Sequence, residues 1–203
     1  ITVIDTTNAL VSLEDAKDFL KISVESEDSI IESMINRASS WANSYTQRLL
    51  LSRVNTDYYD GDGTGTLILN QYPVTTLTSL YDDVDRAFGA GTAINVGSDV
   101  VLDGDNGLIR LFNQAVAFNK GILNVKAVYT AGYTLSAVPA SIQEAVLLYV
   151  GNSYRSQYLG QRFGTTSEHV GDRSTTYSNE ESMNQIKALL NPYRSERAFI
   201  HAV

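Results

Sequence analysis

A glycine-rich run with two aspartates matches a known ligand site in its residue types and spacing. It reads Asp60-Gly61-Asp62-Gly63-Thr64-Gly65, with oxygen ligands at the first, third and fifth positions and glycine at the sixth, as in the first half of a calcium loop. The twelfth position is Gln71 in place of the bidentate glutamate, and we expect a strand before the loop where a helix is needed. The sequence therefore favours a plain Gly/Asp turn over a metal site.

The sequence evidence for other kinds of chemical site is equally weak. The same glycines do not make a phosphate cradle, because Asp62 lies among them and no helix is expected to follow. Ser167-Glu168-His169 supplies the residue types for nucleophilic catalysis, but neighbours on an extended arm point in different directions. The chain has 23 acidic residues, so carboxylate pairs always occur and none is singled out for glycoside cleavage. We therefore expect no catalytic residues and no enzyme.

Composition excludes further classes of site. Cysteine is absent, which rules out disulfides, thiolate nucleophiles and cysteine-bound zinc. The two histidines, His169 and His201, are too few for a multi-histidine metal site, so we expect neither a metal nor a cofactor. The longest apolar run, Ala145 to Val150, is far too short to cross a bilayer, so no membrane partner is expected.

The net charge of −8 is unevenly distributed. Residues 1–136 carry 9 Lys/Arg against 17 Asp/Glu, whereas residues 137–203 carry six of each. Nucleic-acid binding needs clustered Lys and Arg, so this pattern argues against DNA binding, although it is compatible with DNA passing nearby. Solubility alone also explains an acidic surface.

The N-terminal segment predicts two amphipathic helices. Ser12 and Asp15 form an imperfect capping box for a helix over residues 13–20. Ser26 is expected to cap a longer helix, in which apolar residues recur with a 3.6-residue period up to Tyr45. Trp41, the only tryptophan, is expected to be a core anchor of this helix.

The C-terminal segment predicts two more helices and an arm. Pro139 is expected to open a helix that ends near Leu159, since its missing N–H costs nothing in the first turn. Residues 160–178 are polar and glycine-bearing, which is typical of an extended arm. Ser178 to Glu181 is a capping box for a last helix that Pro192 stops.

The middle of the chain predicts strands. A Gly/Asp-rich hairpin turn is expected at residues 103–107, and residues 82–99 read as an irregular, acidic, mobile loop. The expected strands are Thr56–Tyr59, Thr66–Leu69, Val74–Tyr81, Val100–Leu102, Leu108–Phe112 and Leu123–Ala131. The predicted fold is α+β, a small helical bundle with an inserted β-rich lobe and an extended C-terminal arm and helix. We place the helical body at 1–53 and 134–160, the lobe at 54–133, and the arm, helix and tail at 161–203.

Short motifs run through residues 10 to 197 in a fixed order. They are Leu10–Lys17, Glu27–Ile31, the Trp41/Tyr45 helix, Tyr58–Gly63, Tyr72–Val74, Tyr129–Tyr133, Val138–Pro139, Ser167–Asp172 and Leu189–Arg194. In order and spacing they resemble the head–tail connector proteins (adaptor or head-completion proteins) of long-tailed double-stranded DNA phages. The loop at 82–99 shows no such resemblance.

The resemblance implies a structural virion protein without catalysis. Family members assemble, usually as a dodecameric ring, beneath the portal protein, where they extend the DNA channel and receive the stopper or tail-completion protein. Such a chain would act at the head–tail interface of the virion after assembly in the host cytoplasm. The genome would pass through without specific binding. The resemblance places the portal interface in the C-terminal segment, at Tyr193, Arg194, Arg197, Phe199 and Ile200, and the 160–178 arm could add to it.

Two alternatives remain open at this point. The β-rich lobe could be a binding module for a carbohydrate or a host surface, and twelve tyrosines against six phenylalanines mildly favour a binding role. A hydrolase that uses an unrecognised carboxylate pair is the more distant alternative.

Overall fold

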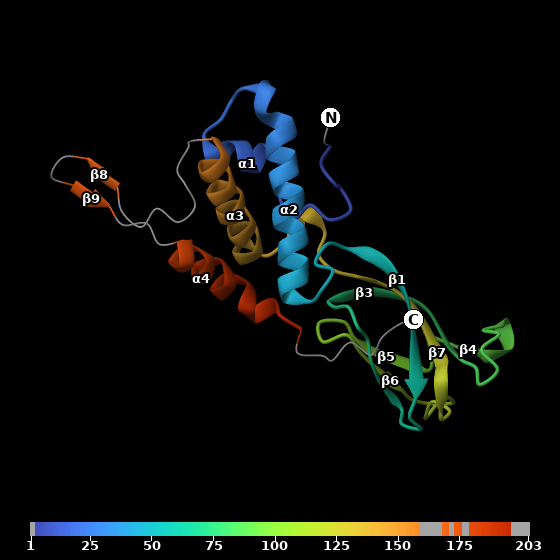
Figure 1. Ribbon diagram of the computed structural model, residues 1–203. Coiled ribbons are helices and arrows are strands. Elements are labelled where there is room, and N and C mark those ends of the chain that lie inside the picture. Colours follow the sequence, from blue (N-terminus) through green and yellow to red (C-terminus); the bar gives the residue numbers. More distant parts are fainter. Residues whose placement is uncertain (1–2, 159–167, 171–172, 176–178, 196–203) are drawn as a thin grey trace. The chain divides into compact units, whose positions relative to one another are not determined.

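The computed structural model describes residues 3–158, 168–170, 173–175 and 179–195 (Figure 1). The chain divides into two compact units. The helical unit contains Ile1–Leu51 and Leu135–Ser195, and the β unit contains Ser52–Thr134. The described residues contain four α-helices and antiparallel sheets, which confirms the predicted α+β class.

The helical unit is built from four α-helices in its described part. In Figure 1, α2 and α3 run side by side, α1 packs against both, and α4 packs mainly against α3. The α-helices are α1 Leu13–Leu20, α2 Asp28–Thr46, α3 Ala140–Tyr158 and α4 Asn179–Leu190. Short 3-10 turns cover Glu25–Glu27 (η1), Leu135–Ala137 (η3) and Asn191–Tyr193 (η4). Among the described residues, no helix has the length and hydropathy to cross a membrane.

The start of each N-terminal helix follows from local hydrogen bonding. The capping box of α1 is confirmed, because the Ser12 hydroxyl accepts from the Asp15 N–H at 3.0 Å and Asp15 accepts from the Ser12 N–H at 3.3 Å. The prediction that Ser26 caps α2 is wrong. Ser26 lies inside η1, and α2 begins at Asp28 without a side-chain cap. The Asp28 N–H already donates to the Glu25 carbonyl, so the 3-10 turn takes up a donor that a cap would otherwise satisfy.

Apolar side chains at helical spacing form the core of the helical unit. The buried side chains of α2 are large and apolar in the first half of the helix and small in the second half. The fully buried positions include Ile31, Met34, Ile35, Ala38 and Ala42 of α2, Ile142, Ala145, Val146 and Val150 of α3, and Ile186 and Leu190 of α4.

Two contacts fix the relative direction of α2 and α3. Near the start of α2, the Tyr154 hydroxyl from the end of α3 donates to the Glu27 carboxylate at 2.7 Å. Near the end of α2, Thr46 accepts from Ser195, and the neighbouring Tyr193 contacts Ser141 at the start of α3. The two helices are therefore antiparallel.

The β unit contains two antiparallel sheets that share one apolar core. The strand orders are β1-β7-β3-β4 and β2-β6-β5. The strands are β1 Arg53–Gly61, β2 Thr66–Ile68, β3 Val74–Asp82, β4 Ala93–Ile94, β5 Val100–Asp103, β6 Leu108–Leu111 and β7 Gly121–Ala131. Leu67, Ile109 and Leu111 from one sheet, with Leu69 just after β2, lie in one buried cluster with Leu80, Val125, Ala127 and Tyr129 from the other sheet.

The predicted hairpin turn is confirmed. Strands β5 and β6 pair from Val100 opposite Leu111 to Asp103 opposite Leu108. Gly107 adopts φ 56°, a left-handed conformation that favours glycine, and its N–H donates to the Gly104 carbonyl. The loop at 82–99 is more regular than expected, because it contains a 3-10 turn (η2, Ala90–Thr92) and β4, which pairs with β3.

Part of the expected C-terminal arm forms a small hairpin. Strand β8, Glu168–Val170, pairs with β9, Arg173–Thr175. In the candidate nucleophile motif, Glu168 and His169 lie in β8, and Ser167 lies outside the described residues.

Candidate docking surfaces

The segment that follows α4 folds back onto the ends of α2 and α3. The Tyr45 hydroxyl donates to the Asn191 side-chain oxygen at 2.6 Å, and Arg48 donates through Nη1 to the Tyr193 carbonyl at 3.0 Å. The Ser195 N–H donates to the Thr46 carbonyl at 2.8 Å. Residues 191–195, called the anchor segment below, are therefore a fixed part of the helical unit.

The anchor segment contains two of the five residues that the resemblance places at the portal interface. The Tyr193 hydroxyl lies 2.8 Å from the Ser141 hydroxyl and is partly buried, so this side chain mainly holds the anchor segment in place. Arg194 is exposed, and its guanidinium carbon lies 5.8 Å from the centre of the Tyr45 ring, which is a cation–π contact. Arg197, Phe199 and Ile200 lie outside the described residues.

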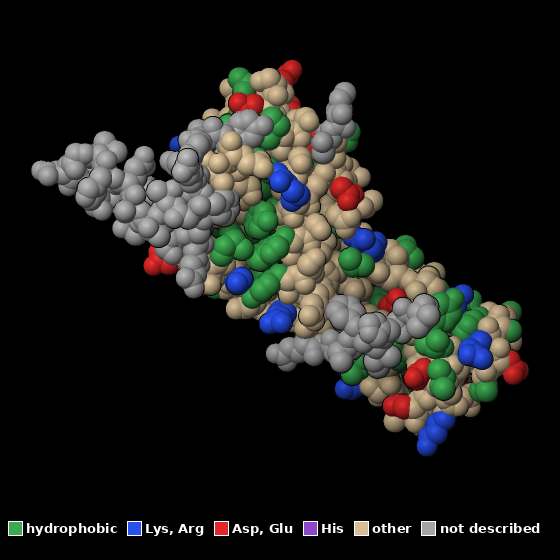
Figure 2. Space-filling model, in the orientation of Figure 1, with side chains coloured by type: hydrophobic (Ala, Val, Ile, Leu, Met, Phe, Trp, Pro, Cys, Tyr) green, Lys and Arg blue, Asp and Glu red, His purple; other side chains and the backbone are tan. Residues whose placement is uncertain are grey.

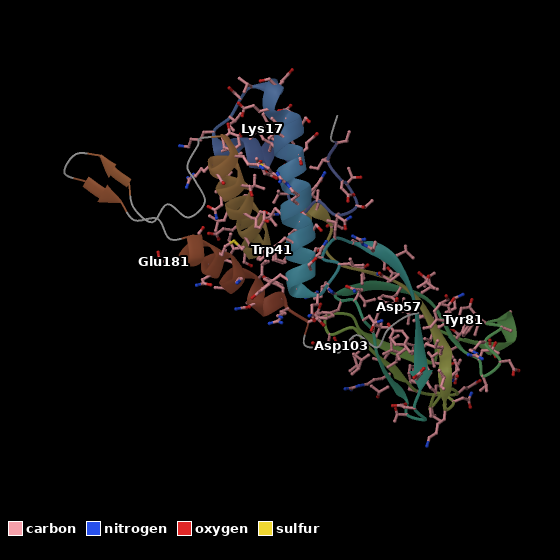
Figure 3. The ribbon with its side chains drawn as sticks, in the orientation of Figure 1. Lys17, Trp41, Asp57, Tyr81, Asp103 and Glu181 are labelled. Atoms are coloured by element: carbon pink, nitrogen blue, oxygen red, sulfur yellow. The ribbon has the colours of Figure 1, made fainter. Side chains whose placement is uncertain are left out.

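An aromatic patch lies beside the anchor segment. We use this name for Trp41, Tyr45 and Tyr149, which are all partly exposed. The Trp41 ring stacks on Tyr45 with centroids 5.3 Å apart, and on Tyr149 of α3 at 5.4 Å. Figure 3 labels Trp41 beside α2 and α3, and Figure 2 shows hydrophobic side chains at the surface of the same region.

The expectation that Trp41 is a core anchor is therefore wrong. Ala38 and Ala42 of the same helix are buried, whereas the Trp41 side chain is only partly buried. Trp41 therefore lies at the edge of the buried face of α2. The 3.6-residue period identified the correct face of the helix but not the edge of the buried stripe.

The carboxylates of the Gly/Asp loop hold the backbone of the β unit. Asp62 accepts from the N–H and the hydroxyl of Thr64, both at 2.7 Å, and these bonds hold the pKa of Asp62 below its usual value. Asp60 accepts from the Leu123 N–H at 2.7 Å. Within the described residues, no three His, Cys, Asp or Glu side chains gather as metal ligands.

A polar network on the inner face of the large sheet has no sequence signal. The Asp57 carboxylate accepts from the Tyr129 hydroxyl at 2.6 Å and from the Tyr59 hydroxyl at 3.1 Å. In turn, the Asn70 N–H donates to Tyr59 and the Gln71 N–H donates to Tyr129. Burial, above all, raises the pKa of both tyrosines well above the usual range. The network fixes the turn after β2 and keeps both hydroxyls protonated as donors.

A second cluster orders the loop after β3. The Asp83 carboxylate accepts from the Phe88 N–H at 2.7 Å and from the Asp85 N–H at 3.0 Å. Burial raises the pKa of Asp83, but these bonds and one from Thr92 lower it further, so the pKa lies below its usual value. The Phe88 ring lies 5.5 Å from the Lys126 ammonium, so the same loop is also held to β7.

Comparison with known proteins identifies the class to which this chain belongs. Residues 9–196 match the model of the family described as "Head completion protein", so the chain belongs to the head completion protein family. Members of this family are structural proteins of phage and phage-like virions. No curated protein matches the chain.

Solved structures show the same fold at low sequence identity. A chain from the neck of an empty GTA particle, computed with C6 symmetry, has a TM-score of 0.64 and 21% identity, and the alignment covers 100% of this chain and 97% of that one. A chain from the neck of a native GTA particle, computed with C12 symmetry, has a TM-score of 0.59, 22% identity and coverage of 100% and 97%. A chain from the virion of a native gene transfer agent particle has a TM-score of 0.59, 20% identity and coverage of 99% and 96%.

Proposed function

We propose that this protein is a ring-forming subunit between the portal protein and the tail or stopper. In this position it completes the head, extends the DNA channel and carries out no chemistry. The family match over residues 9–196 is the observation that carries the proposal, and the full-length agreement with chains from particle necks supports it.

The described surfaces are consistent with such a role. A ring subunit needs two different adhesive faces for its neighbours and one for the structure above it. The aromatic patch is one partly exposed face rich in residues that favour interfaces. A net charge of −8 suits a channel wall, because DNA passes an acidic surface without the condensed contacts that would hold it.

The portal contact is proposed for the residues from the anchor segment onward. The anchor segment is bonded to α2 and α3, so its removal would disturb the helical unit as well as any docking. A cleaner truncation ends at Ser195, which removes Arg197, Phe199 and Ile200 and keeps the anchor.

The test is electron microscopy of portal-bearing heads mixed with the full-length protein or with the chain truncated after Ser195. We expect the full-length protein to form rings seated on the portals and the truncated chain to lose most of this binding at an unchanged melting temperature. An Ile122→Ser variant, which alters a 73% exposed side chain of the β unit, is the control and should bind normally. Full-length protein that ignores the heads, or truncated protein that binds as well as the parent, would contradict the proposal.

A further inference from the structure

The N-terminal end of the helical unit carries the chemical complement of the aromatic patch. Residues 12–32, called the acidic end below, contain seven acidic residues and two lysines. Glu14, Asp18 and Glu25 are exposed on it. Two apolar side chains are exposed among them, Phe19 at 44% and Val24 at 50%. This surface therefore combines negative charge with apolar anchors.

The surroundings of the aromatic patch have the opposite charge. Residues 33–51 and 182–195 contain Arg37, Arg48, Lys187 and Arg194 and no acidic residue, and α3, which supplies Tyr149, carries one acidic residue (Glu144) and one basic residue (Arg155). Arg37 precedes Trp41 by one helical turn and is exposed, and Arg194 covers the Tyr45 ring at the other side of the patch. In Figure 2, blue side chains border the hydrophobic area on α2 and α3, and no red side chain lies within it.

The acidic end and the aromatic patch lie on different parts of the helical unit. The acidic end includes Glu27, which the end of α3 contacts, whereas Tyr45 is bonded to the anchor segment near the other end of α2. At about 1.5 Å per residue, Glu27 lies about 21 Å from Trp41 and about 27 Å from Tyr45 along α2. A contact of the acidic end with Tyr45 over this distance would join two copies of the chain.

We propose that the aromatic patch receives the acidic end of a neighbouring copy. In this contact Phe19 and Val24 cover the exposed rings, while Glu14, Asp18 and Glu25 face Arg37 and Arg194. The contact is heterologous, because two different surfaces pair and each copy still offers one of each, so it can close a ring. The inference rests on the proposed ring function and names the faces through which that ring forms.

The chemistry of the patch favours this occupant. Trp, Tyr and Arg carry most of the binding energy in protein interfaces, particularly where partly exposed rings become fully buried. The surrounding charges contribute mainly to the rate and the orientation of association. A partner that offers exposed acidic and apolar side chains together satisfies both requirements, and the acidic end is such a surface on the same chain.

Cross-linking between engineered cysteines tests the contact, because the native chain has no cysteine. Ser44 lies three residues after Trp41, and Ser26 lies between Glu25 and Glu27; both are exposed. Heads assembled with the Ser26→Cys/Ser44→Cys double variant are treated with a short bis-maleimide. We expect a ladder of covalent multimers, and no ladder from either single variant.

Charge reversal supplies the second arm of the test. Arg37→Glu/Arg194→Glu and Glu14→Lys/Glu25→Lys, each added to the cysteine pair, should lower the cross-linked fraction at least tenfold. Both reversals in one chain should restore at least half of it. The control is Arg86→Glu/Arg110→Glu, which makes the same change in charge at exposed positions of the β unit and should leave the ladder intact.

Measuring whether the protein is incorporated into the heads separates the proposed ring function from the proposed contact between copies. If the Ser26→Cys/Ser44→Cys protein without charge reversal enters the heads, seen by immunoblot, but gives no ladder, the inference is overturned and the ring function still stands. A ladder that survives charge reversal in properly folded variants also overturns it. Double-cysteine protein that never joins the heads refutes the proposed function and, with it, the contact between copies.

Discussion

Replacing Tyr129 by Phe tests the buried network of the β unit. The change removes only the hydroxyl that donates to Asp57 at 2.6 Å, and the ring stays in a position that is 0% exposed. A hydrogen bond to a charged group contributes about 1.5–3 kcal/mol to stability, and the Gln71 N–H also loses its acceptor. At pH 7 we therefore expect the free energy of unfolding of the β unit to fall by about 2–3 kcal/mol.

The same variant should change the pH dependence of stability. The folded protein keeps Tyr59 and Tyr129 protonated at pH values where the unfolded chain has lost both protons, because their pKa is raised above the usual value near 10. The stabilisation is fully present below pH 10 and is lost as the pH rises above it. Each tyrosine contributes about 1.4 kcal/mol per pH unit, so the parent should lose about 2.7 kcal/mol per unit and the variant about half of that.

Urea unfolding between pH 7 and pH 11.5 measures both effects. Circular dichroism follows both units, while fluorescence from the single tryptophan reports on the helical unit and separates the two transitions. Tyr81→Phe is the control, since it removes a hydroxyl from β3, a strand of the same sheet (Figure 3). It should leave the stability at pH 7 unchanged. Parallel pH profiles for Tyr129→Phe and the parent would refute the reasoning.

The remaining predictions concern the patch, the loop after β3 and metal binding. Trp41→Ala should lower the free energy of unfolding in urea by about 2 kcal/mol, less than Ile35→Ala does. The reason is that removal of a partly exposed, stacked ring leaves a smaller cavity than removal of a fully buried side chain. A larger loss for Trp41→Ala than for Ile35→Ala would show that Trp41 is a core residue. Asp83→Asn should speed hydrogen exchange at the Phe88 N–H. The hydrogen bonds that lower the pKa of Asp83 stabilise only its ionised carboxylate, so the difference from the parent should vanish as the pH falls below about 4. Equal exchange in both proteins at pH 7 would contradict this prediction. Calcium and a chelator should give the same melting temperature, and a rise with calcium alone would restore the Gly/Asp loop as a metal site.

Local signals predicted most secondary structure, and non-local packing accounts for the errors. The capping box at Ser12 and the glycine-bearing turn at 103–107 involve neighbouring residues, so the sequence contains their full description. The prediction that Ser26 caps α2 is wrong because the chain enters α2 through a 3-10 turn. The prediction for Trp41 is wrong because its ring lies at the edge of the buried face, where it stacks on Tyr149 of α3. Neither fact is visible in the spacing of α2 alone.

The polar networks could not be predicted for a related reason. Asp57, Tyr59 and Tyr129 come together because β1 pairs with β7 in one particular register, with Tyr59 opposite Val125. A register one residue away would turn each side chain to the other face of the sheet. The portal-interface prediction stays a prediction: the structure shows where Tyr193 and Arg194 lie. The truncation after Ser195 tests the contribution of Arg197, Phe199 and Ile200.

The anchor segment also determines how a pulling force on the C-terminal end of the chain would be transmitted to the helical unit. Force on the chain after Ser195 would act first on the hydrogen bond to Thr46 and then on those of Arg48 and Tyr45, near the C-terminal end of α2. Force applied there is passed to α2 through these bonds as well as along the chain to α4. A C-terminal tether would therefore be mechanically continuous with the core of the helical unit.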